Sequence, residues 1–146
     1  AAQAEIEALN DRLKRTLAEF ENFRKRSERE KAQMFDLGAK SVLEKFLPVI
    51  DNFERSVAQV PESEDSGIKA YAEGMDMIYR QLLKNLKEGG VEAIDAKGKP
   101  FDPAYHNAVM HEDNEELGEN VVSEELQKGY LYKDSVLRHS MVKVAN

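Results

Sequence analysis

The stretch LLKNLKEGGVEAI, residues 82–94, marks the point at which the chain changes from a helical pattern to a β pattern. Leucines at helical spacing precede Gly89, and short β-friendly runs follow Gly90. Glycine readily takes the left-handed conformation that ends a helix, so Gly89-Gly90 acts as a stop signal. The sequence therefore predicts an α+β chain, with helices before this point and a small all-β domain after it.

A helical hairpin is predicted immediately before the stop signal. An apolar stripe runs along residues 68–88, and the acidic, turn-rich stretch PESEDSG at 61–67 separates it from a broad apolar face on residues 42–60. Pro48 lacks a backbone donor, so we expect the first of these helices to kink or restart near Phe46–Leu47. Two such helices from each of two chains would form a dimeric four-helix bundle, which we assign to residues 48–90.

Residues 1–47 are predicted to form one long helix that pairs with a second copy as a coiled coil. Strong helix formers dominate, and Gly38 is the one glycine of the segment. Apolar residues alternate at spacings of three and four, which is the coiled-coil pattern. The stretch Arg24–Gln33 interrupts this pattern with polar residues, so pairing should be weak there. The predicted dimer seam consists of Ile6, Leu9, Leu13, Phe20, Phe23, Met34 and Leu37.

The last third of the chain, residues 91–146, is predicted to be a compact β domain. Turn signals such as Lys133-Asp134 separate short β-favouring runs. The final run, Ser135–Val144, is expected to be a single strand. The remaining predicted strands are Val91–Ile94, His106–Met110, Val121–Val122 and Tyr130–Tyr132.

Composition argues against several classes of function. The net charge is −7, and residues 91–146 hold 11 acidic against 6 basic groups, whereas a nucleic-acid binder usually needs a basic face. The chain has no cysteine, which excludes a thiolate nucleophile or a Cys-bound metal. No apolar run approaches the roughly 18 residues of a membrane span. We therefore expect no nucleic-acid partner and no membrane insertion.

One group of residues is a candidate for catalytic chemistry. Asp102, His106 and His111 could be imagined as a metal site of a hydrolase, but their spacing matches no metal motif. Local hydrogen bonds within a turn are the commoner role of such Asp and His side chains. The acidic pairs Glu115-Glu116 and Glu124-Glu125 are interpreted as solvated surface. We expect no enzyme and no cofactor, but a partner-binding protein, either a co-chaperone of the kind described next or a structural coiled-coil adaptor with a β docking module.

Four segments, taken together and in order, resemble the GrpE family, the nucleotide exchange factors of DnaK-type chaperones. They read AEFENFRKR at 18–26, LPVIDNFER at 47–55, FDPAYHNAV at 101–109, and LQKGY at 126–130 followed by VLRHSMVKV at 136–144. Each motif alone is modest, but four in one order on this architecture are specific. The resemblance extends from about Ala4 to Ala145.

The resemblance implies a homodimer with paired long helices, a four-helix bundle and one β domain on each protomer. It implies that a β domain enters the nucleotide cleft of the chaperone's ATPase domain and tilts one lobe outward, so that ADP leaves. It also implies that weak pairing in the long helices acts as a temperature brake in heat stress. We expect a bacterial cytoplasmic protein, although a chain that begins with Ala1 leaves an organelle matrix open.

The resemblance also carries functional residues onto this chain. It implies that three apolar residues of the β domain, Phe101, Leu126 and Val144, touch the chaperone. The alternative role for these residues is to form the core of the β domain. Gly74 corresponds to a small residue on the chaperone-facing side of the second helix. Ser140 departs from the family, which usually has alanine there. The implied partner-binding residues are Phe101, Leu126, Val144, Gly74, Arg24, Lys25, Arg26, Lys128 and Arg138, with an intrachain ion pair as the alternative for Arg138; Asp102, Pro103, His106 and Gly129 are implied to shape turns.

Overall fold

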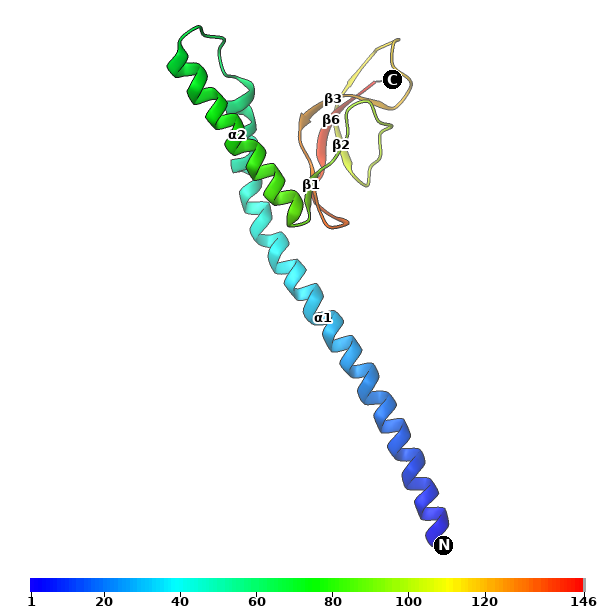
Figure 1. The fold of residues 1–146 in the computed structure, drawn as a ribbon. Coiled ribbons are helices and arrows are strands. Elements are labelled where there is room, and N and C mark those ends of the chain that lie inside the picture. Colours follow the sequence, from blue (N-terminus) through cyan, green and yellow to red (C-terminus); the bar gives the residue numbers. More distant parts are fainter. Residues whose placement is uncertain (146) are drawn as a thin grey trace. The chain divides into compact units, whose positions relative to one another are not determined.

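The computed structural model describes residues 1–145, which form two compact units that meet at residues 41 and 42. The elements, most of which are labelled in Figure 1, are α1 (Ala2–Ala58), α2 (Ser66–Glu88), β1 (Val91–Ala93), β2 (His106–Glu112), β3 (Val121–Gln127), β4 (Tyr130–Tyr132), β5 (Ser135–Arg138) and β6 (Ser140–Ala145). The predicted α+β order, with helices followed by a small β domain, is confirmed. Helix α1 begins in the first unit and ends in the second.

Helix α1 continues through Pro48, so the predicted restart of the helix does not occur. Proline removes one hydrogen bond of the helix but leaves its remaining turns intact. Leu47 and Ile50 are both buried beside it, so tertiary packing supports the helix on either side of the missing bond. The division of the chain at residue 47 stays a prediction.

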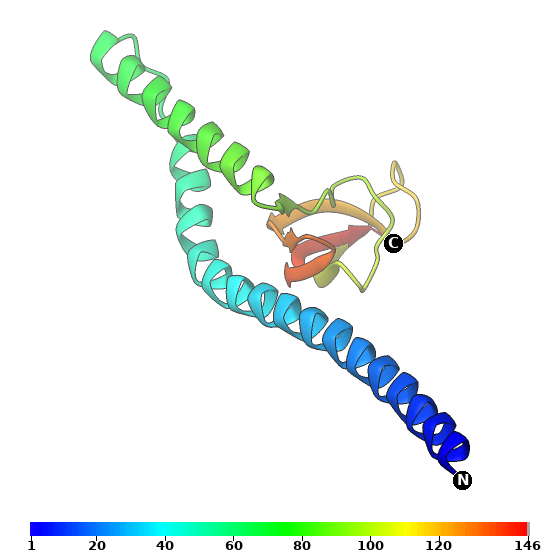
Figure 2. The same ribbon diagram turned by 60° about the horizontal axis from the view of Figure 1, so that its bottom comes forward.

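The hairpin of α1 and α2 is defined by its caps. Asp65 precedes α2, and its Oδ1 atom accepts hydrogen bonds from the backbone N–H groups of Gly67 at 2.8 Å and Ile68 at 3.3 Å. Gly89 ends the helix, and Gly90 follows with φ of +92°, as the glycine stop signal predicts. Figures 1 and 2 show α2 running back beside the last turns of α1, where the rings of Phe53 and Tyr79 stack 5.8 Å apart.

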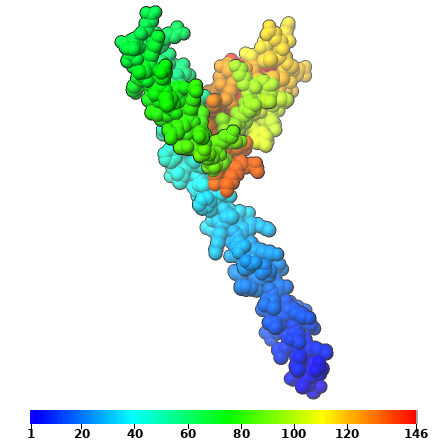
Figure 3. Space-filling model, in the orientation of Figure 1, coloured from blue at the N-terminus to red at the C-terminus, as the bar shows by residue number. Residues whose placement is uncertain are grey.

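The β domain consists of two three-stranded sheets. Strands β1, β4 and β5 form an antiparallel sheet in the order β1-β4-β5. Strands β2, β6 and β3 form the second sheet, in which β6 lies in the middle, parallel to β2 and antiparallel to β3. In the view of Figure 3, the domain, coloured lime to red, meets the helices at one end and diverges from α2 beyond that point.

The prediction that Ser135–Val144 is one strand is wrong. The segment divides at His139 into β5 and β6, which belong to different sheets. The backbone N–H of Ser140 donates to the carbonyl of Tyr105, which directs β6 toward β2 while β5 stays paired with β4. The predicted strand Val121–Val122 is also longer than expected, because pairing with β6 continues through Gln127.

The core of the β domain contains both aliphatic and aromatic side chains. One buried cluster consists of Ala96, Val122, Val142 and Val144, and the side chains of Tyr130 and Tyr132 are also buried. Phe101 and Ala108 are partly buried and pack against this cluster. A core of this size holds a module of about 55 residues only weakly, which makes its attachment to the helices important.

Candidate partner-binding site

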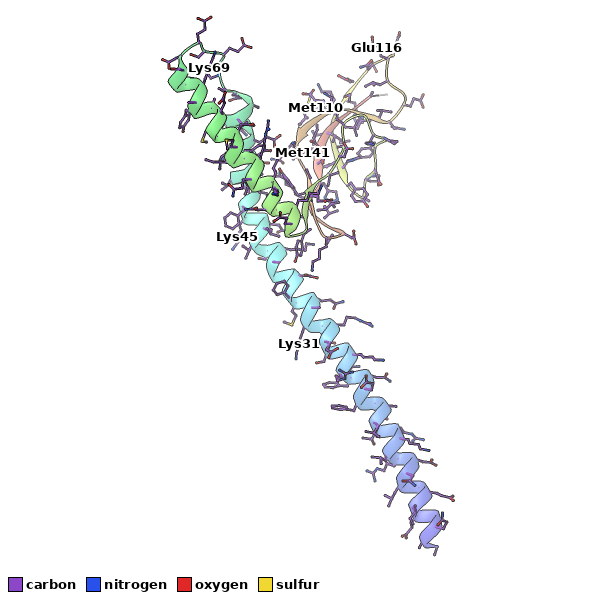
Figure 4. All side chains as sticks on the ribbon, viewed as in Figure 1. Lys31, Lys45, Lys69, Met110, Glu116 and Met141 are labelled. Carbon is purple, nitrogen blue, oxygen red and sulfur yellow. The ribbon has the colours of Figure 1, made fainter. Side chains whose placement is uncertain are left out.

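Leu126 is the most accessible of the three apolar residues of the β domain that are implied as contacts. It lies on β3 with 43% of its surface exposed. Further apolar side chains are exposed on β2, on β6 and in the turn before β2; Figure 4 labels two of them, Met110 and Met141. The exposed apolar residues of the β domain are Tyr105, Val109, Met110, Leu126 and Met141.

The other two apolar residues implied as contacts lie in or against the core of the β domain. Val144 is only 2% exposed and lies within the central cluster, so its side chain is not available to a partner in this conformation. Phe101 is partly buried, packs on the same cluster and lies 5.9 Å from the ring of His106. Val144 is buried because its side chain packs with those of Ala96, Val122 and Val142.

Asp102 and His106 form a hydrogen-bonded turn, as predicted. The backbone N–H of Asp102 donates to Nδ1 of His106 at 3.0 Å, and Oδ1 of Asp102 accepts from the N–H of Ala104 at 2.9 Å. The intervening Pro103 lies within this turn. Burial lowers the pKa of His106, so the ring is held neutral and accepts at Nδ1. Within residues 1–145 no three His, Cys, Asp or Glu side chains gather in a way that could hold a metal.

Gly129 is required by a close approach of two backbone segments. A Cβ atom placed on it would lie 2.4 Å from the nitrogen of Ser140 and 2.6 Å from the carbonyl oxygen of Arg138. The N–H of Gly129 donates to the hydroxyl oxygen of Ser140 at 3.0 Å, and the Ser140 side chain is fully buried. The hydroxyl at position 140 thus satisfies a buried donor that an alanine could not reach.

A cluster of polar side chains joins α1 and α2 to the β domain, and we call it the polar junction. Arg138 donates from Nη1 and Nη2 to the two carboxylate oxygens of Asp51, at 2.6 and 2.7 Å. The same guanidinium donates to the backbone carbonyl of Lys128 and lies over the ring of Tyr130. Lys128 forms a second ion pair with Glu54 at 3.2 Å. The polar junction consists of Asp51, Glu54, Tyr79, Glu125, Lys128, Tyr130 and Arg138.

The structure therefore favours the ion-pair alternative for Arg138. Its side chain is 22% exposed and that of Asp51 is 14% exposed, so the pair is largely removed from water. Lys128 is more accessible but is also engaged. Burial alone would lower the pKa of Lys128, but the charge and hydrogen bond of Glu54 raise it, which keeps the amine protonated.

The interpretation of Glu125 as solvated surface is wrong. Its Oε2 atom is buried without a described hydrogen-bond partner, and burial raises the pKa of the carboxyl group. The hydroxyl groups of Tyr79 and Tyr130 are likewise buried with no described partner, and burial raises the pKa of both. Alternation around a bulge in β3 turns Glu125 inward, and one sequence gives no sign of a bulge.

The predicted basic residues of α1 are on an exposed helix surface in the first unit. Arg24 pairs with Glu21 at 2.7 Å and with Glu28 at 3.2 Å. Arg26 lies 5.6 Å from the centre of the Phe23 ring, and Lys25 is exposed. In the second unit, a Cβ atom on Gly74 would meet no described atom within 4 Å outside its own helix backbone, so this chain alone does not require a glycine there.

Both units also carry exposed apolar residues on their helices. In the first unit all seven predicted seam residues are more than half exposed, and Leu17 and Phe35, which are not part of the predicted seam, are exposed as well. In the second unit the corresponding residues of α1 are Val42, Phe46 and Val49, and those of α2 are Ile68, Tyr71, Met77 and Ile78. Apolar surface of this extent is typical of an interaction surface.

The site thus belongs to a chain in which a long helix and a helical hairpin carry a small β domain with an exposed leucine. The model of the GrpE family matches residues 1–146, and the chain belongs to the GrpE family. It is 59% identical over 139 residues to Protein GrpE of Lachnoclostridium phytofermentans, covering 94% of this chain and 61% of that protein. It is 47% identical over 143 residues to Protein GrpE of Parageobacillus thermoglucosidasius, covering 98% of this chain and 63% of that protein.

Protein GrpE of Brevibacillus choshinensis is more distant, at 42% identity over 142 residues, with 97% of this chain and 78% of that protein covered. The chain therefore spans somewhat less than two thirds of the length of the first two relatives. Across the described residues, neither helix has the length and apolar character needed to cross a membrane.

Proposed function

We propose that this chain is a co-chaperone that accelerates ADP release from the ATPase domain of a DnaK-type chaperone. The observation that carries the proposal is the family match over residues 1–146. Leu126, exposed on β3, supplies an apolar anchor of the kind that dominates protein interfaces. Exchange requires no covalent step. The protein needs only to bind the open form of the nucleotide cleft more tightly than the closed form, at about 1.4 kcal/mol for each tenfold shift.

The test is the release of fluorescently labelled ADP from a DnaK-type chaperone, followed by stopped flow with and without this protein. We expect the release rate to rise with protein concentration and to reach a plateau. A rate that does not change, in a sample shown to be folded, would leave the coiled-coil adaptor as the better reading. We further place the reaction in the bacterial cytoplasm, with the chaperone.

We also propose that the chain acts as a homodimer, paired along the predicted seam and through a four-helix bundle of residues 48–90. The exposed apolar residues of α1 and α2 support this proposal, since a second copy is the simplest partner that buries them. In this arrangement residues 1–47 form the paired helix and residues 91–146 the compact β domain of each protomer.

Replacing Ile78 by glutamate is expected to weaken the dimer about 30-fold. Ile78 is 53% exposed, so burying this exposed part of its side chain in the dimer contributes about 1 kcal/mol. A symmetric dimer contains two such side chains. Sedimentation equilibrium measures the change: the unaltered chain should behave as twice its 16.6 kDa mass. Lys84→Glu, at an exposed position of the same helix, is the control. A dimer of unchanged affinity in the Ile78 variant would argue against the bundle.

A further inference from the structure

A hollow separates α1 from β3 where the β domain is attached to the helices. A cavity of about 300 Å³ lies between α1 and β3, lined among others by Asp51, Glu54, Glu125, Leu126 and Lys128. Because side chains do not fill this space, apolar packing cannot by itself fix the angle between α1 and β3. The two ion pairs of the polar junction cross from α1 to the β domain at the rim of this hollow.

Arg138 ties three parts of the fold together. It holds Asp51 of α1 with two short, parallel hydrogen bonds, a geometry that restricts both distance and direction. It binds the carbonyl of Lys128 in the link between β3 and β4, and it covers the ring of Tyr130 on β4. The link it binds is also the segment where Gly129 meets Ser140 at the start of β6. One guanidinium thus connects the helix to both sheets.

We infer that the Asp51–Arg138 pair is a clamp that sets the β domain rigidly on the helices and so positions Leu126 to open a partner's cleft. The inference rests on the proposed function. A wedge opens a cleft only if its base resists bending, since otherwise the contact energy moves the wedge instead of the lobe. Leu126 lines the same hollow that the clamp borders, so a change in the angle between α1 and β3 displaces this residue directly.

A variant that lacks both charged side chains, Asp51 and Arg138, distinguishes the loss of the clamp from unfolding of the domain. Asp51→Leu alone leaves Arg138 buried without its partner and should destabilise the domain. Asp51→Leu with Arg138→Met replaces the pair by apolar groups of similar size and should recover much of this stability, although the carbonyl of Lys128 loses its donor and Nε2 of Gln127 loses its acceptor. The matched control is Asp95→Leu with Lys99→Met. It removes an exposed pair of the β domain, with oxygen and nitrogen 3.7 Å apart, that does not reach the helices.

Two measurements on the clamp double variant test the inference. The first is the plateau rate of labelled-ADP release and the protein concentration that gives half of it. We expect the plateau to fall at least fivefold while the half-maximal concentration changes less than threefold, and the control to match the unaltered protein. The second is a distance distribution between spin labels on cysteines introduced at Lys84 and Glu119, in a chain that has no cysteine of its own, diluted with unlabelled protein. We expect the distribution to broaden in the double variant only.

The outcomes are distinct. If the unaltered protein gives no acceleration, the proposed function fails before the clamp is tested. If it accelerates release and the double variant reaches the same plateau, or if the distance distribution stays narrow, the clamp inference is overturned. Should the double variant not fold, Arg138→Lys keeps the positive charge but loses the two-pronged geometry, and the same two readouts then decide.

Discussion

Replacing Leu126 by aspartate is expected to reduce the acceleration of ADP release by about 100-fold at a fixed, subsaturating protein concentration. Leu126 is already 43% exposed, so the substitution should leave the fold intact. In the complex, however, the new carboxylate would be desolvated against an apolar surface. The loss of apolar burial and the cost of desolvation together amount to about 3 kcal/mol, which corresponds to roughly two orders of magnitude.

The measurement is stopped-flow release of labelled ADP, accompanied by a thermal melt of each protein. The control is Met110→Asp, which places the same charge at another exposed apolar position, on β2. We expect the Leu126 variant to lose far more activity than the control, at an unchanged melting temperature. Equal activity in the Leu126 variant and the unaltered protein would show that Leu126 on β3 does not contact the chaperone. The helices would then be the expected contact surface.

Replacing Gly129 by valine is expected to destabilise the β domain by more than about 4 kcal/mol, which exceeds what a module of about 55 residues can tolerate. A Cβ atom at this position meets backbone rather than flexible side chains, at 2.4 Å from Ser140 and 2.6 Å from Arg138, so the two segments must separate. Separation would also break the hydrogen bond from Gly129 to the Ser140 hydroxyl.

Amide hydrogen exchange tests this expectation region by region. The β domain of the Gly129 variant should lose protection while α2 keeps its own. Gly98→Val is a useful comparison, because a Cβ atom there meets no described atom within 4 Å, although its φ of +81° strains any residue with a side chain. A smaller loss of protection in that variant would attribute the effect at Gly129 to the close approach. Full protection of the Gly129 variant would contradict the geometry described above.

The features that could be predicted from the sequence are those that depend on residues close together in the chain. Gly89-Gly90 ends α2 where glycine chemistry requires it, and the turn of Asp102 and His106 follows from side chains that bond to nearby backbone. The GrpE resemblance, based on four ordered motifs, is confirmed by the family match. The stop signal, the turn and the motifs can each be recognised in a single sequence, because each is formed by residues that are neighbours in the chain.

The features that could not be predicted depend on residues far apart in the chain. Asp51 and Arg138 are 87 positions apart, and neither carries a sign of the other. The apolar side chain of Val144 suits an interface as well as a core, and only its tertiary packing against residues such as Ala96 and Val122 decides between the two roles. The break at His139 and the inward turn of Glu125 arise from pairing register, which periodicity does not specify.

The central position of β6 has a consequence for how the protein is made. Strand β6 pairs with both β2 and β3, so neither of these strands has its sheet partner until residues 140–145 have left the ribosome. Helices α1 and α2 depend on local hydrogen bonds and can form while synthesis continues. A nascent chain would therefore acquire its helices first, and the sheet of β2, β6 and β3 could form only once β6 had been synthesised.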